Sequence, residues 1–186
     1  MASATWSVEV DGLTRVFGSF VAVNGISFKV RAGQIFGFLG PNGAGKSTTI
    51  RMLTGILPPT SGRGRVAGFD MHTERRQIKK AIGYMSQKFS LYEDLSVHEN
   101  LRFFGGVYDA ADFDWAIRVC RLDECLHMLC SALPAGLRQR AALACAVVHR
   151  PKIVFLDEPT AGVDPASRRA FWELIYSLAQ IGRAHV

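Results

Sequence analysis

The chain has 186 residues, 48% of them hydrophobic, and its 22 Lys and Arg against 16 Asp and Glu give a formal net charge of +6. The chain is long enough to bury a solid core. No apolar run approaches the roughly 18 residues of a membrane span, and the N-terminus lacks the pattern of a secretory signal. We therefore expect a single cytosolic domain. The four cysteines lack CxxC spacing, which indicates free structural thiols rather than a metal or redox site.

The N-terminal part of the chain is expected to form strands that lead into a loop. Ser7–Val10 and Ile26–Val30 alternate apolar and polar residues, a pattern typical of half-exposed strands, and we predict that they are antiparallel. Ile35–Leu39 is a short apolar run, which predicts a buried strand directly before a glycine-rich loop.

The glycine-rich loop is the strongest functional signal in the chain. Its sequence GPNGAGKST fits the phosphate-binding pattern G-x-x-x-x-G-K-[ST], and it stands between an expected strand and an expected helix. Glycines let the backbone bend around a polyphosphate and aim N–H groups at it, while the Lys46 ammonium reaches the outer phosphates and the Ser47 hydroxyl ligates Mg²⁺. We therefore expect a nucleoside triphosphate to bind Gly40, Pro41, Asn42, Gly43, Ala44, Gly45, Lys46, Ser47 and Thr48.

A cluster of basic residues follows the loop in the sequence. It consists of Arg63, Arg65, Arg75, Arg76, Lys79 and Lys80. Such a cluster can bind nucleic acid or an anionic membrane surface, but no aromatic residues interleave with it and no nucleic-acid motif accompanies it. We interpret it as a solvated helix face and expect no nucleic-acid partner.

The remaining elements are predicted to alternate between short strands and helices. The expected strands are Arg65–Ala67, after a turn at 58–62, and the apolar runs Ile82–Met85 and Ile153–Leu156. A capping box of Ser96 and Glu99 precedes one helix, and Leu137–Val148 is apolar enough to be a buried helix. Asp164 is expected to cap the last helix, whose apolar face is Phe171, Leu174, Ile175 and Leu178.

The sequence IVFLDEP, residues 153–159, is the second chemical signal. An ATPase needs a carboxylate at the end of a buried strand beside the phosphate loop, where it holds Mg²⁺ through water, and Asp157 has that position. Glu158 follows directly, and a carboxylate just beyond the metal ligand can polarise an attacking water. Glu158 is therefore the candidate general base.

These motifs, in this order, resemble those of the ATP-binding cassette (ABC) ATPases, the engines of ABC transporters. The resemblance covers the chain from about Val8 to Gln180. It implies an α/β fold in which a P-loop NTPase core carries an antiparallel β subdomain and an inserted helical subdomain at about 88–150, with the ABC ATPase domain spanning 1–180.

The resemblance assigns roles to residues outside the two motifs. Phe17 stands where the family places an aromatic ring that stacks on adenine, usually a tyrosine. Gln87 is similar to a glutamine that contacts Mg²⁺ and the attacking water and relays the nucleotide state to the membrane partner. Asp164, in the segment 161–164, is similar to a residue of the loop that crosses the dimer interface near the nucleotide.

The chain departs from the family in its signature segment. The family usually has Leu-Ser-Gly-Gly-Gln before Arg-Gln-Arg, and the serine and glycines contact the nucleotide of the opposite subunit. Here Leu133–Leu137 reads LPAGL, which leaves the N–H of Gly136 as the main anion donor. Proline-containing segments of this kind resemble those of bacterial exporter ATPases, including drug-efflux types.

A second departure concerns the end of the sequence. The family continues after the helix that holds Phe171 into another strand and a histidine that contacts the γ-phosphate, and His185 has no strand before it. Residues 181–186 are similar to translated sequencing adapter, so we interpret them as a non-native tail. We therefore expect the chain to bind ATP but to hydrolyse it poorly.

The resemblance favours one function and leaves two alternatives open. The favoured function is the Mg²⁺-dependent ATPase subunit of an exporter, peripheral on the inner face of the membrane, that pairs with a second ATPase domain and drives a transmembrane permease subunit through the region 87–104. One alternative is a soluble ABC protein that acts on nucleic acid or ribosomes. The other is a kinase or GTPase outside the family, for which Gln87 and Gly136 would have no role.

Overall fold

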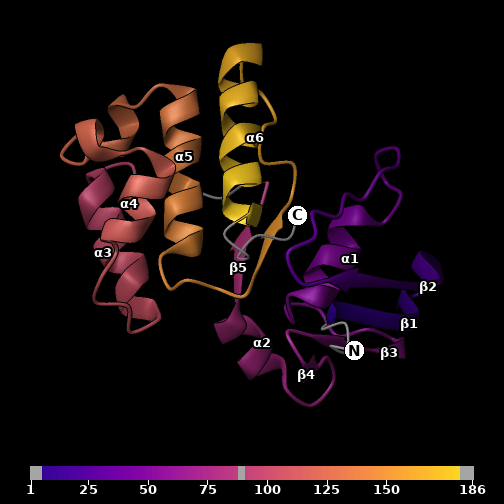
Figure 1. The fold of residues 1–186 in the computed structure, drawn as a ribbon. Coiled ribbons are helices and arrows are strands. Elements are labelled where there is room, and N and C mark those ends of the chain that lie inside the picture. The colour runs from indigo at the N-terminus through magenta and orange to yellow at the C-terminus, as the bar shows by residue number, and fades with distance from the viewer. Residues whose placement is uncertain (1–5, 88–90, 181–186) are drawn as a thin grey trace.

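The computed structural model describes residues 6–87 and 91–180. Two groups of elements flank a central layer (Figure 1): an antiparallel sheet with helix α1 (Lys46–Leu53) on one side, and helices α3 to α5 on the other. Strand β5 and helix α6 stand between the two groups. The order expected from the sequence, strands leading into a loop and then alternating strands and helices, is present in this arrangement.

The antiparallel sheet has the strand order β2-β1-β3-β4. Strands β1 (Trp6–Phe17) and β2 (Phe20–Arg31) contain both predicted N-terminal strands and extend them. Strand β3 (Ser61–Val66) begins inside the predicted turn, because its first residues pair with β1, and it ends before Ala67, which has a positive φ. The short strand β4 (Phe69–Asp70) completes the sheet.

The central layer contains two parallel strands, both predicted with their observed bounds. Helix α2 (Arg75–Ala81) leads directly into β5 (Ile82–Met85), and β5 pairs in parallel with β6 (Ile153–Leu156). All four residues of β6 are buried, as expected for a strand that is covered on both faces. The two strands end side by side, since Met85 is the partner of Leu156.

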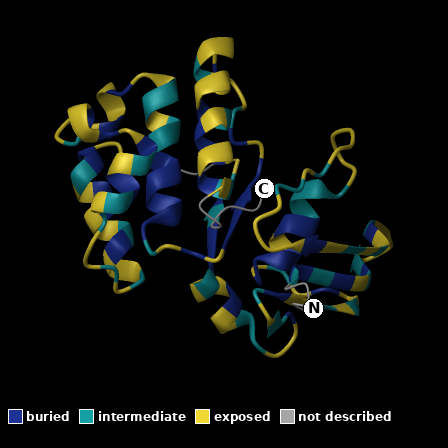
Figure 2. Ribbon diagram, in the orientation of Figure 1, coloured by how far each residue is buried: buried dark blue, intermediate teal, exposed yellow. Residues whose placement is uncertain are grey.

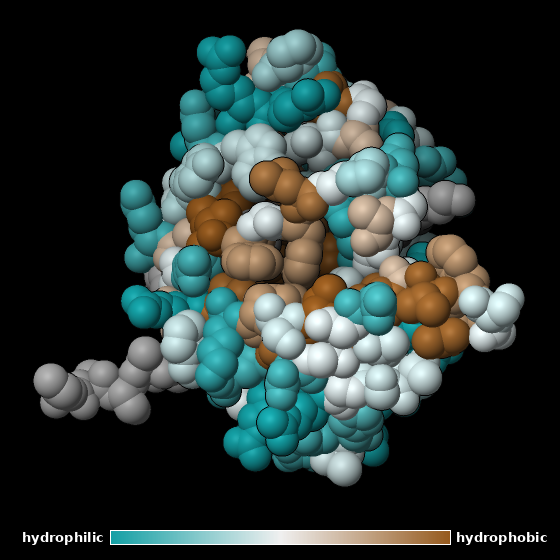
Figure 3. Space-filling model, turned by 90° about the vertical axis from the view of Figure 1, so that its right-hand side faces the viewer, coloured by the Kyte–Doolittle hydropathy of each residue, from teal (hydrophilic) through white to brown (hydrophobic). Residues whose placement is uncertain are grey.

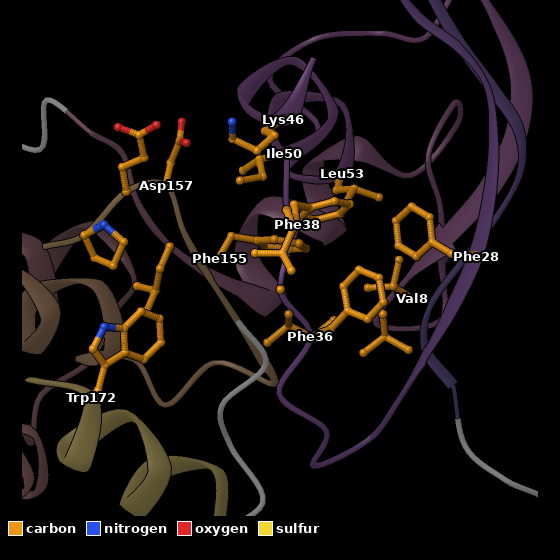
Figure 4. A pocket seen from close by; sticks show the side chains of 17 residues that line it. Val8, Phe28, Phe36, Phe38, Lys46, Ile50, Leu53, Phe155, Asp157 and Trp172 are labelled. Carbon is orange, nitrogen blue, oxygen red and sulfur yellow. The ribbon is translucent and has the colours of Figure 1, made fainter. Parts of the chain in front are cut away.

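The strand predicted at Ile35–Leu39 is not formed, and this prediction was wrong. The backbone of this segment is in no sheet, and the side chain of Leu39 is 98% exposed. A strand persists only where a neighbouring strand pairs with its N–H and C=O groups. A cavity of about 270 Å³, lined on one side by Phe36 and Phe38 and on the other by Phe155, separates this segment from β6. Figure 4 shows these rings around the cavity, and Figure 3 shows a hollow surrounded by apolar side chains on one face of the molecule.

The helical layer is built around α5 (Ala135–Val147). Helix α3 (Val97–Val107) begins with the predicted capping box, in which the Ser96 hydroxyl accepts a hydrogen bond from the Glu99 N–H. Helix α4 (Asp114–Cys120) and two 3₁₀ turns, Asp123–Cys125 and Cys130–Ala132, connect α3 to α5. The C-terminal half of α5 is buried (Figure 2), and so are all four cysteines, which are free as predicted. Burial raises the pKa of the Cys120 thiol to about 12, which makes it unreactive.

Helix α6 (Pro165–Gln180) begins with the predicted aspartate cap. One carboxylate oxygen of Asp164, Oδ1, accepts hydrogen bonds from the backbone N–H groups of Ala166 at 3.0 Å and Ser167 at 2.9 Å. The predicted apolar face of the helix is buried; it consists of Phe171, Leu174, Ile175 and Leu178. The cap and the apolar face together fix the helix against α4 and α5, in the same apolar cluster as Val154 and Leu156 of β6.

His149 joins the end of the helical layer to the start of β5. Its ring stacks on Tyr108 with centroids 3.8 Å apart, Nε2 lies 3.0 Å from the carbonyl oxygen of Ile82, and Nδ1 is buried without a hydrogen-bond partner. Burial lowers the pKa of His149 below its usual value of 6.5, because protonation would place a charge and a second N–H in this site.

This environment predicts a pH dependence of stability. The folded protein binds the His149 proton less readily than the unfolded chain, so the stabilisation is complete above pH 6.5 and is lost as the pH falls through the lowered pKa. We expect the thermal unfolding midpoint to fall more between pH 7.5 and 5.5 in the native chain than in His149→Gln, measured by circular dichroism. Equal falls in the two proteins would show that His149 does not carry the effect.

Candidate functional site

The phosphate loop bends sharply just before α1. Gly43 and Gly45 have φ values of +85° and +82°, a conformation that side chains with a Cβ disfavour. A Cβ at Gly45 would also collide with the carbonyl oxygen of Ala22 in β2, so the loop packs tightly against this strand. Gly45 is the N-cap of α1, and no side chain caps the helix or places an acid in its first turn. The first N–H groups of α1 therefore present a positive end to an anion.

Lys46 is folded into the loop. Its Nζ atom donates hydrogen bonds to the carbonyl oxygens of Gly40 at 2.6 Å and Pro41 at 2.9 Å. Both acceptors belong to the loop itself, so the ammonium group lies beside the backbone that would surround a phosphate. A phosphate oxygen carries more negative charge than a carbonyl oxygen, and it can attract the ammonium group in their place.

Ser47 and Asp157 meet at the opposite side of the loop. The Ser47 hydroxyl donates a hydrogen bond to Oδ1 of Asp157 at 3.0 Å, although the two residues are 110 positions apart in the sequence. Asp157 is 6% exposed and follows the last residue of β6, where its N–H donates to the carbonyl oxygen of Met85 at 2.9 Å. A hydroxyl and a carboxylate are oxygen ligands of the kind that Mg²⁺ prefers.

The Ser47 and Asp157 oxygens fit a Mg²⁺ ion that also binds nucleotide phosphates and water better than they fit a metal ion held only by protein side chains. Within residues 6–87 and 91–180, no three His, Cys, Asp or Glu side chains are grouped so that they could hold a metal ion. Mg²⁺ usually keeps several waters and takes one or two carboxylates together with substrate phosphates. Ser47 and Asp157 can provide the protein part of such a site.

Gln87 and Glu158 form a second polar pair at the same edge of the parallel strands. The Gln87 side-chain amide donates a hydrogen bond to Oε2 of Glu158 at 2.8 Å. Gln87 comes two residues after β5 and Glu158 two residues after β6, so the parallel pairing of these strands brings the side chains together. Glu158 is exposed and has a φ of +51°, an uncommon conformation for a residue with a side chain, and such conformations occur often at functional sites.

One pocket of about 470 Å³ collects most of the predicted residues. Its lining comes from the phosphate loop, from the polar pair and from β2, and it comprises Phe20, Ala22, Asn42, Gly43, Gly45, Lys46, Ser47, Thr48, Gln87 and Glu158. Figure 4 shows the Lys46 ammonium group and the Asp157 carboxylate at one end of the neighbouring aromatic cavity. The phosphate loop, a metal-type donor set and a carboxylate are thus assembled in one place.

Seven predicted site residues are not among those that line this pocket: Gly40, Pro41 and Ala44 of the loop, Asp157 beside it, and Phe17, Gly136 and Asp164. Phe17 is 44% exposed, and the guanidinium carbon of Arg15 lies 4.5 Å from its ring centroid. Gly136, in the first turn of α5, packs so closely against Ser167 that an added Cβ would lie 2.6 Å from the Ser167 hydroxyl oxygen. Asp164 caps α6, and its hydrogen bonds from Ser167 hold the pKa of the carboxyl below its usual value.

Sequence reasoning missed Phe20 and Ala22, which line the pocket from β2. The available signal was the alternation of the strand, which places residues 20 and 22 on one face and residue 21 on the other. Alternation does not tell which face meets the phosphate loop, because that loop is 20 residues further along the chain.

Comparison with known proteins identifies the family. Residues 23–161 match the family model described as ABC transporter. The chain belongs to the ABC transporter family. Its α/β fold, with an antiparallel sheet and a helical layer, is that of the ABC ATPase domains among solved structures. Members of this family bind ATP.

Named relatives support the same assignment for this ABC domain. It is 47% identical over 181 residues to the probable multidrug ABC transporter ATP-binding protein YbhF of Escherichia coli, an alignment that covers 94% of the chain and 31% of YbhF. It is 35% identical to the linearmycin resistance ATP-binding protein LnrL of Bacillus subtilis, over 94% of the chain and 58% of LnrL. The chain thus spans about a third to three fifths of the length of these two relatives.

The fold of the domain is also found in solved structures. It superposes on cbiO1 from Clostridium perfringens, part of the ABC transporter complex cbiONQ, with a TM-score of 0.87 and 27% identity, covering 97% of this chain and 77% of that one. It superposes on an ATP-binding subunit of an ABC transporter with a TM-score of 0.81 and 25% identity, covering 96% and 77% of the two chains.

Proposed function

We propose that this ABC domain binds and hydrolyses ATP with Mg²⁺ as the ATP-hydrolysing part of an exporter. The observation that carries the proposal is a single edge of the fold at which Lys46, the Ser47–Asp157 pair and the Gln87–Glu158 pair lie around one pocket. These side chains come from segments far apart in the sequence, and each has a function that ATP hydrolysis requires.

The site residues have three different roles in the reaction: phosphate binding, Mg²⁺ binding and proton transfer. Loop N–H groups and Lys46 bind the phosphates and neutralise their charge. Ser47 and Gln87 would ligate Mg²⁺ directly and Asp157 through water, and the ion supplies charge neutralisation on the outer phosphates when bound. Glu158 accepts a proton from the attacking water, and its hydrogen bond from Gln87 orients the carboxylate.

The proposal includes a second ATPase domain. Gly136 and Asp164 do not line the pocket of their own chain. They lie near each other, because Gly136 packs against Ser167 and the N–H of Ser167 donates a hydrogen bond to Asp164. We assign both residues to the nucleotide bound by the partner domain. Such an arrangement lets ATP hold two domains together and lets hydrolysis release them.

The association and release of the two ATPase domains would drive a separate transmembrane permease at the inner face of the membrane. Within residues 6–87 and 91–180, no helix combines the length and the apolar character that crossing a membrane requires. The proposed coupling region, 87–104, contains an exposed aromatic group in which Tyr92 and Phe103 have ring centroids 4.8 Å apart. Residues 88–90 of this region lie outside the described residues.

The relatives' names favour an exporter over the alternatives. YbhF is named as a multidrug transporter protein and LnrL as a resistance protein, and both names refer to ATP binding. These names favour the transporter function over action on nucleic acid or ribosomes.

The proposal is tested by titrating the chain with ATP in isothermal titration calorimetry, once with Mg²⁺ and once with EDTA. We expect saturable binding with Mg²⁺ and at least about tenfold weaker binding without it, because the ion screens the phosphate charges. Absence of ATP binding by the folded chain in both conditions would refute the proposal.

A further inference from the structure

A second pocket lies behind the polar pair of Gln87 and Glu158. It has a volume of about 190 Å³ and extends from the ends of the parallel strands to the first turns of α5 and the loop before α6. Of the described residues that line this pocket, Gln87 and Glu158 alone also line the phosphate pocket. The pair therefore separates the two pockets, and a group in the second pocket can act on it from the side away from the nucleotide.

Gln139, in α5, lines the second pocket and has a buried hydrogen-bond acceptor. Its side-chain oxygen, Oε1, receives no hydrogen bond from any residue in 6–87 or 91–180. A buried amide oxygen without a donor costs free energy, so native proteins pair such atoms with protein groups or with buried water. The pocket has room for water, since one molecule takes up about 30 Å³ in the liquid.

The side-chain amide of Gln87 has a hydrogen left to donate. Its NH₂ group carries two hydrogens, and one of them is used in the 2.8 Å bond to Oε2 of Glu158. A single hydrogen bond leaves an amide free to pivot about it. Bonds to both hydrogens fix the plane of the amide and hence the direction of its oxygen. That oxygen is the atom of Gln87 that Mg²⁺ would bind, because the ion prefers oxygen ligands.

We propose that Gln139 is a positioning residue for Gln87. A water in the second pocket accepts the second N–H of Gln87 and donates to Oε1 of Gln139, so the Gln87 amide is held by Glu158 on one side and by Gln139 on the other. This inference rests on the proposed function, in which the Gln87 oxygen ligates Mg²⁺. Groups that hydrogen-bond to a metal ligand set its orientation, and their removal weakens metal binding.

Two other polar side chains line the second pocket, among the residues that the structure describes. Arg138 is held by the turn before α5, because its guanidinium group donates to the carbonyl oxygens of Ser131 and Leu133, each at 3.2 Å. Ser86 has a hydroxyl group that could donate to Gln139 instead. A bond from Ser86 would make Gln139 a packing residue with no influence on Mg²⁺, and the experiment separates the two cases.

The experiment measures how much Mg²⁺ strengthens ATP binding, as the ratio of the dissociation constants obtained by isothermal titration calorimetry with EDTA and with Mg²⁺. The ratio is determined for the native chain, Gln139→Met, Gln87→Ala and the double variant. Methionine has nearly the length of glutamine but lacks the amide acceptor. Gln77→Met is the matched control, because Gln77 is an exposed glutamine of α2 that lines neither pocket. Thermal melting checks that each variant is folded.

We expect Gln139→Met to lower this ratio by about three- to tenfold, the effect of one neutral hydrogen bond, while the ATP affinity in EDTA stays at the native value. In the Gln87→Ala background the same substitution should have no further effect, because the group that Gln139 positions is gone. Gln77→Met should match the native chain in both conditions.

Three results would overturn this inference alone. They are an unchanged ratio in Gln139→Met, an equal loss of ATP affinity with Mg²⁺ and with EDTA, and a loss that persists in full in the Gln87→Ala background. The last result is what a hydrogen bond from Ser86 would give. A native chain that binds no ATP in either condition, or that gains nothing from Mg²⁺, would instead refute the proposed function.

Discussion

Lys46→Ala is expected to weaken Mg²⁺–ATP binding by about a hundred- to ten-thousandfold. Hydrogen bonds to charged groups contribute roughly 1.5–3 kcal/mol each, and the ammonium group can make at least two of them to phosphate oxygens. The loss leaves the fold intact, because the present partners of Lys46 are carbonyl oxygens of the exposed loop. Isothermal titration calorimetry with ATP measures the effect.

Lys79→Ala is the control for this substitution. Lys79 is an exposed lysine in α2, so its removal makes the same change in net charge away from the pocket. We expect its ATP affinity to stay within about twofold of the native value, as for other surface substitutions. Undiminished ATP affinity in Lys46→Ala would mean that the phosphates are held elsewhere.

Glu158→Gln is expected to reduce ATP turnover by about 10²- to 10⁴-fold while ATP binding is retained. A positioned general base contributes this much to a rate, and glutamine has nearly the same shape as glutamate but cannot accept the proton. The amide oxygen of the new side chain can still accept the hydrogen bond that Gln87 now donates to Glu158, so the local structure is kept. Single-turnover hydrolysis of radiolabelled ATP measures even a slow native rate.

Glu173→Gln provides the comparison for the loss of one negative charge. Glu173 is exposed on α6, and it is not among the residues that line the phosphate pocket. Its turnover should match that of the native chain. If Glu158→Gln hydrolyses ATP at the native rate, another group must accept the proton from the attacking water.

Local patterns in the sequence were sufficient for most of the elements and for the two motifs. The phosphate loop, the capping box at Ser96 and the aspartate cap at Asp164 each depend on residues within about four positions of one another. Strands β5 and β6 were predicted with their observed bounds, because each is a short, wholly apolar run with polar neighbours.

The tertiary structure alone decided how these pieces meet. The Ser47–Asp157 hydrogen bond joins residues 110 positions apart, and the Gln87–Glu158 bond depends on the parallel pairing of β5 with β6. The resemblance to a family implied that these residues share a site, whereas their spacing in the sequence did not contain the distances between them.

Two further features were beyond any local pattern. Ile35–Leu39 is as apolar as β6, yet it forms no strand because a cavity separates it from the strand it could pair with. Phe20 has the same alternating neighbours as other strand residues, and only the packing of β2 against Gly45 places it in the phosphate pocket. The sequence by itself determined the chemical groups and the local turns and helices, since these arise from neighbouring residues. Pairing partners and pocket walls were decided by the folded structure, because they depend on contacts between segments that the chain brings together only on folding.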